Sequence, residues 1–366
     1  MKNKNLFIVN TPFHLLTTFI LSRSYFIGDD NYLALLHPHG YAKWQDSLVM
    51  RHLSSTSGGW RQVFFLGKWL SSRHKTKSFR QQVAEIRDTI GKIGIDAAYL
   101  GSDFDVQNQL LVAALNIDQF YRYEDGLYSY YNEDRRRPLP HRLFHQVKAQ
   151  ALKTLAGISG KFPINTSASG DSPAGSGDFL YKPELLERYS PQTYKIEQAM
   201  IQQALQELAG REFFQPAMEP NSILYLSQPL VELKKLPMDE ELAILQKILT
   251  QAAGGKKNRL LYKPHPNDSA AKIDYYRKAL PAMNLYNSIE PVELAFAYEK
   301  NLKMIISYQS SALMFTDTFA LRPIVPVSLG RFYRQPMHLA YKNILQKAGV
   351  HFPQDLHELA DLLAKD

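Results

Sequence analysis

The chain has 366 residues, enough for two domains of ordinary size, and its 45% hydrophobic and 12% aromatic content is typical of folded globular proteins rather than disordered ones. It contains no cysteine, which excludes disulfides, thiolate zinc sites and cysteine nucleophiles and fits a reducing compartment. The formal net charge of +8 favours anionic partners.

The apolar run at the amino terminus is short. Leu6–Val9 is followed at once by Asn10-Thr11-Pro12, whereas a signal peptide needs a longer apolar stretch and a small-residue cleavage site. No window reaches the roughly 18 apolar residues that a membrane-spanning helix needs. We therefore expect a soluble, cytoplasmic protein.

Basic residues cluster in two places, Arg73–Arg80 and Arg135–Arg137. Such clusters can contact nucleic acid, anionic lipid or an acidic small substrate. No helix-turn-helix signature, zinc finger or aromatic RNA-binding motif accompanies them, so nucleic acid is not expected as a partner. A solvated basic face and a patch on a membrane surface both remain open.

Short apolar runs alternate with helix-like segments along the chain. The runs that predict strands are Leu6–Val9, Tyr32–Leu36, Gln62–Leu66, Ala97–Leu100, Gln119–Tyr123, Ile223–Leu226, Arg259–Tyr262, Asn284–Tyr286, Lys303–Ser307 and Pro323–Val327. The main helix-like segments are Pro12–Ile27, Phe79–Ile90, Val106–Leu115, Glu240–Gln251, Ala270–Leu280, Val292–Lys300 and Ser310–Phe319. This alternation indicates parallel sheets, and two such series predict an α/β chain of two Rossmann-like domains that face a central cleft.

A small, polar, Gly/Pro-rich stretch, Asn165–Asp178, lies between the two series and is predicted to be a mobile loop. The helix-like segment Gln192–Leu208 follows and can still cap the first domain. We place the boundary near Pro216–Asn221, which divides the chain into domains 1–218 and 219–366. The tail helix Gln354–Lys365 can pack on either domain.

The first predicted strand ends in Asn10-Thr11-Pro12. Asn10 or Thr11 can cap the next helix, with Pro12 in its first turn. Because ligands sit outside the carboxyl ends of parallel strands, this helix start also borders the expected cleft. A plain capping signal is the alternative interpretation, and His14, inside the helix, is expected to be a packed residue.

The strand Gln119–Tyr123 ends in Glu124-Asp125-Gly126. A carboxylate at this position can act as a general base on a hydroxyl group, with its pKa set by its neighbour and by burial. The alternative interpretation is a simple Asp-Gly turn.

Two predicted strands of the second series end in further polar motifs. Arg259–Tyr262 leads into Lys263-Pro264-His265-Pro266, and Lys303–Ser307 leads into Ser310-Ser311, which open an apolar helix. Free backbone N–H groups, serine hydroxyls and a helix dipole favour an anion, usually phosphate. The pair of motifs therefore predicts an enzyme that handles a phosphate-bearing donor.

Three more acids and a lysine are candidates for ligand or metal binding, and each also has a structural interpretation. Glu293 lies in the first turn of a helix, where it can accept hydrogen bonds from ribose hydroxyls or simply complement the helix dipole. Lys263 can add charge at the phosphate or be solvated. Asp103 and Asp105 form a DxD triplet of the kind that holds a metal ion, but they precede a helix, where aspartates are expected as caps. We expect no metal site.

The ordered set Glu124-Asp125-Gly126, His265-Pro266 and Ser310-Ser311 resembles the bacterial sialyltransferases, a group that includes the lipooligosaccharide sialyltransferases, the polysialyltransferases and the marine-type multifunctional enzymes. The Asn10-Thr11-Pro12 start is similar to that of the lipooligosaccharide enzymes. The resemblance spans most of the chain, although each motif is only two to five residues long.

The resemblance implies a GT-B fold and an inverting, metal-independent transfer of sialic acid from CMP-sialic acid to a galactoside-type hydroxyl of a lipooligosaccharide or capsular glycan. Glu124 or Asp125 matches the general base, with Glu124 favoured. His265 matches the histidine that contacts the donor phosphate and protonates the leaving group. Donor-binding candidates are Lys263, Pro266, Glu293, Ser310 and Ser311, and acceptor-binding candidates are Asn10 and Thr11.

The implied partners are a nucleotide-sugar donor and a glycan or glycolipid acceptor, with peripheral contact at the inner membrane face and no further cofactor. The acceptor would bind the first domain and the donor the second. Lys-Pro-His-Pro followed by Ser-Ser-Ala-Leu-Met-Phe also resembles the teichoic-acid glycerophosphotransferases, which use CDP-glycerol. The alternatives are therefore three. The protein can transfer glycerol phosphate, it can transfer another sugar in surface-polysaccharide synthesis, such as Kdo or a hexose, or it can be a non-catalytic module that binds anionic glycans.

Overall fold

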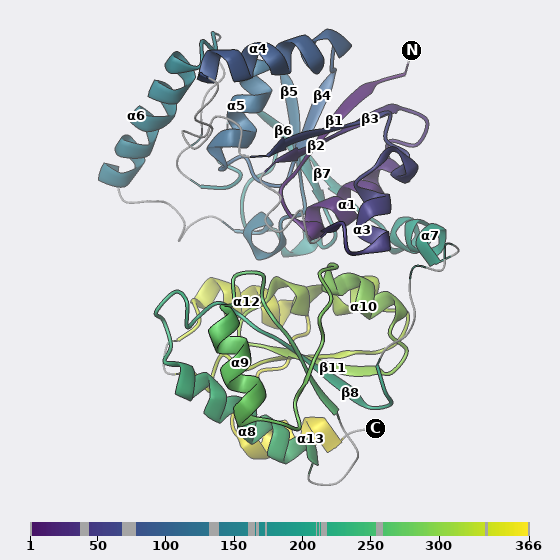
Figure 1. Cartoon of the computed structure of the whole chain (residues 1–366), viewed down its shortest axis with the longest axis vertical. Coiled ribbons are helices and arrows are strands. Elements are labelled where there is room, and N and C mark those ends of the chain that lie inside the picture. Colours follow the sequence, from purple (N-terminus) through teal and green to yellow (C-terminus); the bar gives the residue numbers. More distant parts are fainter. Residues whose placement is uncertain are drawn as a thin grey trace. The chain divides into compact units, whose positions relative to one another are not determined.

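The computed structural model describes residues 2–36, 44–67, 78–131, 139–159, 165, 168–172, 174–209, 211, 213, 218–253, 259–333 and 336–364. The chain divides into two compact units, Met1–Gly210 and Arg211–Asp366, each with its own sheet (Figure 1). The division falls shortly before the 218/219 boundary expected from the sequence. The basic cluster Arg135–Arg137 and residues 73–77 of the other cluster lie outside the described residues.

The first unit has a seven-stranded parallel sheet in the order β3-β2-β1-β4-β5-β6-β7. Its strands are β1 (Lys4–Val9), β2 (Asp30–Leu36), β3 (Gln62–Gly67), β4 (Ala97–Leu100), β5 (Gln119–Tyr123), β6 (Gly175–Leu180) and β7 (Thr193–Lys195). Every side chain from Leu6 to Val9 in the central strand is fully buried. This burial is expected of a parallel strand that helices cover on both faces.

Helices flank this sheet on both sides. Those described are α1 (Pro12–Ser22), α3 (Leu48–Leu53), α4 (Phe79–Thr89), α5 (Val106–Ala114), α6 (Leu139–Leu155) and α7 (Gln198–Ala209). Figure 1 shows α4, α5 and α6 on one side and α1, α3 and α7 on the other. Side chains of α4, α5 and α6 share one core cluster with Leu6 and Ile8 of β1.

The prediction of a mobile loop over Asn165–Asp178 is wrong at its carboxyl end, because Gly175–Asp178 belong to strand β6. The sequence of this strand is rich in glycine and lacks β-branched residues, so propensity does not reveal it. Its glycines have a packing role, since a Cβ at Gly175 would lie 2.7 Å from Nη1 of Arg122. The side chain of Asp178 is fully buried.

The second unit has a five-stranded parallel sheet in the order β10-β9-β8-β11-β12. Its strands are β8 (Ser222–Leu226), β9 (Arg259–Lys263), β10 (Asn284–Leu285), β11 (Leu302–Ser307) and β12 (Val325–Ser328). Its helices are α8 (Met238–Ala253), α9 (Ala270–Ala279), α10 (Val292–Tyr298), α11 (Thr316–Phe319), α12 (Leu339–Lys347) and α13 (Leu356–Ala364). The tail helix α13 packs on α8, in the core of this unit.

The expected α/β architecture with two parallel sheets is confirmed, with differences in detail. The strands β6 and β7 and the helices α3, α6 and α12 are absent from the prediction, and β7 replaces the start of the helix expected over Gln192–Leu208. The helix expected over Ser310–Phe319 is a 3-10 turn, η6 (Ser311–Phe315), followed by α11. Within the described ranges, none of the helices has both the length and the apolar character that crossing a bilayer requires.

The two sheets share one strand order over their first five strands in sequence. The order reverses beside the first strand of each series, which lies between β2 and β4 in the first unit and between β9 and β11 in the second. In open α/β sheets, ligands bind outside the carboxyl ends of the strands at such a reversal. Functional residues are therefore expected at the carboxyl ends of β1 and β4 in the first unit and of β8 and β11 in the second.

Candidate active site

In the first unit, the carboxyl ends of β1, β4 and β5 bring together Thr11, Gly101 and Asp125. Thr11 and Asp125 were predicted from the sequence, and Gly101 was not. Thr11 follows β1 and caps α1, since its hydroxyl accepts a hydrogen bond from the backbone N–H of His14 at 3.1 Å. Gly101 follows β4, and Asp125 follows β5. Because β1, β4 and β5 are neighbours, these groups share one edge of the sheet.

His14 and Asp125 form a hydrogen-bonded pair at this edge. Nε2 of His14 lies 2.7 Å from Oδ1 of Asp125. The imidazole is 4% exposed and lies edge-on to the ring of Tyr123 at 5.3 Å between centroids. The side chain of Asp125 is 23% exposed. A buried imidazole thus fixes one oxygen of a carboxylate that solvent or substrate can reach.

Sequence reasoning missed this role of His14, which was expected only to pack. The burial is as expected, but the ring also has a charged partner 111 residues away in the chain. The pairing could have been predicted from where the two residues lie relative to the strands. A histidine in the first turn after one strand faces an acid directly after another strand, and both strands belong to the centre of the sheet.

Gly101 makes room for the imidazole. A Cβ at this position would lie 2.5 Å from Cε1 of His14 and 2.6 Å from its Nε2, closer than real Cβ contacts allow. Any larger residue at Gly101 would displace the ring from Asp125. The glycine after β4 is therefore required by the His14–Asp125 pair and not by an unusual backbone angle.

Glu124, the favoured base in the sequence analysis, lies inside the protein. Its side chain is 0% exposed. The carboxylate accepts hydrogen bonds from the backbone N–H groups of Gly126 at 3.0 Å and Tyr181 at 3.3 Å, and from the hydroxyl of Tyr130. Burial raises the pKa of Glu124 to about 8, although these hydrogen bonds oppose the shift. Its geometry is that of an anchor for the loop after β5.

The two aspartates of the DxD triplet have structural partners. Asp103 is fully buried, lies 3.0 Å from Nη1 of Arg122 and accepts hydrogen bonds from the backbone of Gly170 and Ser172. Asp105 caps α5, as expected, and accepts from the backbone N–H of Gln107 at 2.7 Å. Among the described residues, no three His, Cys, Asp or Glu side chains gather as metal ligands would.

Asn10, the other acceptor-binding candidate, is half-buried at the end of β1. Its Oδ1 is shielded from solvent and has no hydrogen-bond partner among the described residues. Buried polar atoms normally find partners, so this amide is available for a ligand in a way that the capping hydroxyl of Thr11 is not.

In the second unit, His265 follows β9 in a turn that fixes its tautomer. Its backbone N–H donates to Oδ2 of Asp268 at 2.9 Å, and its Nδ1 accepts from the backbone N–H of Asn267 at 3.1 Å. The proton of the neutral ring is therefore on Nε2. Burial lowers the pKa of His265 below its usual value, so the neutral ring, a hydrogen-bond donor through Nε2, is favoured.

A buried ionic cluster holds this turn in place. Lys272 is fully buried in α9, with Nζ 2.9 Å from Oε2 of Glu241 and 3.1 Å from Oδ1 of Asp268. The hydroxyl of Tyr262 donates to the other oxygen of Asp268 at 3.0 Å. Lys272 was not predicted from the sequence, because a lysine on a helix is usually solvated. The cluster fixes Asp268 and, through it, His265.

Ser310 and Ser311 follow β11 and are half-buried. Ser310 caps the turn η6, and its hydroxyl accepts from the backbone N–H of Ala312 at 3.3 Å. Strand β8 lies between β9 and β11, so the His265 turn and the two serines end strands on either side of it. Pro266 is exposed beside His265.

Lys263 contacts the segment between β10 and α10, and Glu293 lies in the first turn of α10. Nζ of Lys263 donates to the carbonyl oxygen of Ser288 and lies 5.5 Å from the ring centroid of Tyr286. Burial lowers the pKa of Lys263 to about 8, against the opposing effect of Glu290 and Glu293. Glu293 is 5% exposed, and burial raises its pKa to about 7 while Lys263 opposes the shift.

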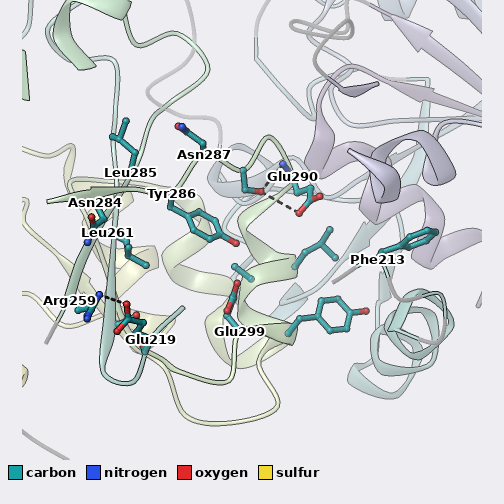
Figure 2. A pocket seen from close by; sticks show the side chains of 15 residues that line it. Phe213, Glu219, Arg259, Leu261, Asn284, Leu285, Tyr286, Asn287, Glu290 and Glu299 are labelled. Carbon is teal, nitrogen blue, oxygen red and sulfur yellow. Dashed lines mark hydrogen bonds and ion pairs between the residues drawn. The ribbon is translucent and has the colours of Figure 1, made fainter. Parts of the chain in front are cut away.

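A cavity of about 510 Å³ lies beside this segment, between strands β9 and β10 and helix α10 (Figure 2). Tyr286, Glu290 and Glu299 line it, whereas the buried Glu293 does not. Lys263, by bonding the carbonyl of Ser288, fixes the segment that forms one rim of the cavity. Its volume is within the range of small-molecule sites.

Solved structures with a similar fold include a UDP-N-acetylglucosamine 2-epimerase, with a TM-score of 0.53, 10% identity and coverage of 99% of this chain and 86% of that one. The UDP-GlcNAc 2-epimerase from Neisseria meningitidis bound to UDP-GlcNAc has a TM-score of 0.51 and 12% identity over 98% of this chain and 90% of that one. The glycosyltransferase VinC in complex with dTDP has a TM-score of 0.50 and 11% identity over 99% and 91%.

At such identities these likenesses establish the fold alone, and they confirm the predicted GT-B-like fold with two α/β units, each built on a parallel sheet. A search of curated protein sequences finds no match. The sequence model of the alpha-2,8-polysialyltransferase (POLYST) family matches residues 5–321, which is most of the chain. The chain therefore belongs to the alpha-2,8-polysialyltransferase family of glycosyltransferases.

Proposed function

We propose that the protein transfers sialic acid from CMP-sialic acid to a hydroxyl group of a lipooligosaccharide or capsular glycan, with inversion and without a metal ion. The observation that carries the proposal is the His14–Asp125 pair at the carboxyl edge of the first sheet, in a chain of this family. A half-buried carboxylate with one oxygen fixed and the other free has the geometry of a general base.

Asp125, rather than Glu124, is the proposed base. Glu124 is fully enclosed and its oxygens already accept three hydrogen bonds, so an acceptor hydroxyl has no access to it. In the proposed step, Asp125 takes the hydroxyl proton while the hydroxyl oxygen bonds to the anomeric carbon. The bond from that carbon to the phosphate oxygen breaks, and CMP leaves with both electrons. Asn10 is the proposed acceptor contact, and Thr11 acts through the cap of α1.

The second unit supplies the proposed phosphate contacts. His265 would donate a hydrogen bond from Nε2 to the phosphate as a neutral ring, which stabilises the developing charge without transferring a proton. The hydroxyls of Ser310 and Ser311 are the other proposed donors. This changes the role inferred from the resemblance, because a neutral ring whose Nδ1 already accepts a hydrogen bond is poorly suited to act as an acid.

The cavity beside β10 is the proposed place of the nucleoside. Glu290 lines it and is the proposed acceptor for the ribose hydroxyls, in place of the buried Glu293. Lys263 would position the rim of the cavity through the carbonyl of Ser288. The proposal includes a cytoplasmic location and peripheral contact with the inner membrane face, where an anionic lipid-linked acceptor suits the net charge of +8.

The donor is tested by incubating the full chain with CMP-sialic acid and either lactose or an α2,8-linked sialic acid oligomer, in buffer with a chelator. CMP release that increases with acceptor concentration supports the proposal. Turnover of CDP-glycerol or a UDP-sugar without turnover of CMP-sialic acid would contradict it. Donor binding with no turnover of any of these donors would contradict it as well and would indicate a binding module.

A further inference from the structure

Helix α6 (Leu139–Leu155) has a large apolar face that points away from the core of the first unit. Leu139, Leu143 and Val147 are 65%, 58% and 69% exposed, and Phe144 and Leu155 are 65% and 60% exposed. They are five of the fifteen exposed large hydrophobic side chains in the described part of the chain. Single exposed apolar residues are ordinary, but five on one helix need a physical explanation.

The exposed face lies opposite the face that packs on the core. Ala149 is 1% exposed and belongs to the core cluster of the first unit, and Leu152 packs against the same cluster. At about 100° per residue, the exposed apolar residues form an arc roughly opposite to these two. The helix is therefore apolar on two sides, one covered by its own unit and the other exposed among the described residues. Figure 1 shows α6 at the outer margin of the first unit, beyond α5.

The charges of α6 are all of one sign. Between Leu139 and Leu155 the sequence has Arg142, Lys148 and Lys153 and no aspartate or glutamate. Lys148 is exposed and follows Val147 directly. Arg142 is half-buried and Lys153 is 6% exposed, so Lys148 is the exposed cation beside the apolar face. An exposed apolar face with a cation and no acid on its helix is complementary to a surface that is apolar within and negatively charged outside.

Positive charge continues where the carboxyl end of α6 meets α4. A shallow hollow of about 600 Å³ there is lined by Arg80, Arg87 and Lys92 together with Gly157. Asp88, which pairs with Lys92, also lines it. The basic character is thus a property of this flank of the first unit and not of the helix alone.

We propose that α6 docks the protein on an anionic lipid bilayer, lying in the interface with Leu139, Leu143, Phe144 and Val147 among the acyl chains near the headgroups. The inference names the surface that makes the membrane contact included in the proposed function and rests on that part of it, but not on the identity of the donor. At 17 residues, α6 is about 25 Å long, sufficient to lie on a bilayer surface.

The test is flotation of the full chain with large unilamellar vesicles, either of phosphatidylcholine alone or with phosphatidylglycerol added. The wild-type chain is expected to float with the anionic vesicles and not with the neutral ones, less so at high salt because screening shortens the reach of the charges. Leu143→Gln/Val147→Gln should weaken this binding about tenfold or more, since each buried apolar side chain contributes strongly to partition. Lys148→Glu should weaken it to a smaller extent.

The matched control is Leu321→Gln, which changes an equally exposed leucine of the second unit and should leave vesicle binding unchanged. All variants are compared for thermal unfolding and for CMP release with lactose. The α6 variants should keep the wild-type unfolding temperature and the wild-type rate of CMP release. A failure of the proposed reaction is therefore recorded separately from a failure of docking. Equal flotation of wild type and the α6 double variant overturns the inference. A second result would also overturn it. If the wild type forms a dimer and does not bind vesicles, and the double variant no longer forms that dimer, a second copy of the chain covers the helix.

Discussion

The imidazole of His14 holds Asp125 at 2.7 Å across the carboxyl edge of the first sheet, and the two residues are 111 positions apart in the chain. The pair gives the two adjacent acids after β5 different environments. Asp125 is accessible and oriented, whereas Glu124 is enclosed and structural.

Gly101→Ala should disable the pair without touching the substrate. The added methyl would overlap the His14 ring, and we expect kcat to fall about 10–100-fold while the KM for CMP-sialic acid is unchanged. Gly91→Ala is the control, since its nearest neighbour would be 3.6 Å away. An unchanged kcat in Gly101→Ala would show that the pair has no role.

Glu124 should make the fold less stable as the pH rises. Its pKa in the folded protein is about 8, above that of an unfolded glutamate at 4.5, so the folded state holds the proton more tightly. The stabilisation is complete below about pH 4.5 and is lost as the pH rises toward 8. Urea unfolding at several pH values measures this slope, which Glu124→Gln should reduce. An identical slope in the variant would contradict the assignment.

Asp178→Asn should destabilise the first unit strongly. Burial alone would raise the pKa of Asp178, but hydrogen bonds from Arg122 and Arg188 lower it to about 2. Neutralising this carboxylate removes the charge that Arg188 faces and leaves Arg122 with Asp103, at a cost of about 3–5 kcal/mol. Urea unfolding with Asp118→Asn, an exposed aspartate before β5, gives the comparison. If both variants unfold alike, β6 is not held by these charges.

Glu290→Gln and Glu293→Gln should differ in their effect on CMP binding. Glu290 lines the cavity, and loss of a charged hydrogen-bond acceptor there is expected to weaken CMP about tenfold or more. Glu293 is buried, so its replacement should alter unfolding and leave affinity nearly unchanged. Calorimetric titration with CMP distinguishes the two. If CMP binding is weakened in Glu293→Gln and not in Glu290→Gln, the ribose contact is Glu293 and the proposal for Glu290 is wrong.

The sequence sufficed for the repeated strand–helix pattern and for the motifs that end β1, β5, β9 and β11, because apolar runs and turn residues are local signals. It did not suffice for β6, whose two glycines are explained only by the neighbours that the fold brings beside them, Arg122 at Gly175 and the backbone of Gln192 at Gly177. Nor did it reveal His14 or Lys272 as members of charged networks. The partner of His14 is set by strand order. Lys272 pairs with Asp268 four residues earlier, but only the fold shows that this pair is buried together with Glu241.

The choice between the two acids of the β5 loop is where the sequence and the structure diverge most. Both residue types suit a general base, and adjacency in the chain gives no reason to prefer either. Three hydrogen bonds and complete burial make Glu124 an anchor, and the exposed fraction of 23% leaves Asp125 as the residue an acceptor can reach.

The rate of acceptor-dependent CMP release from CMP-sialic acid, compared between the wild-type chain and Asp125→Asn, tests the central claim most directly. We predict that kcat falls about 10²–10⁴-fold in Asp125→Asn with CMP binding retained, as loss of a general base requires. Asp118→Asn, at the opposite end of β5, should keep the wild-type rate. A near wild-type rate in Asp125→Asn would contradict the account.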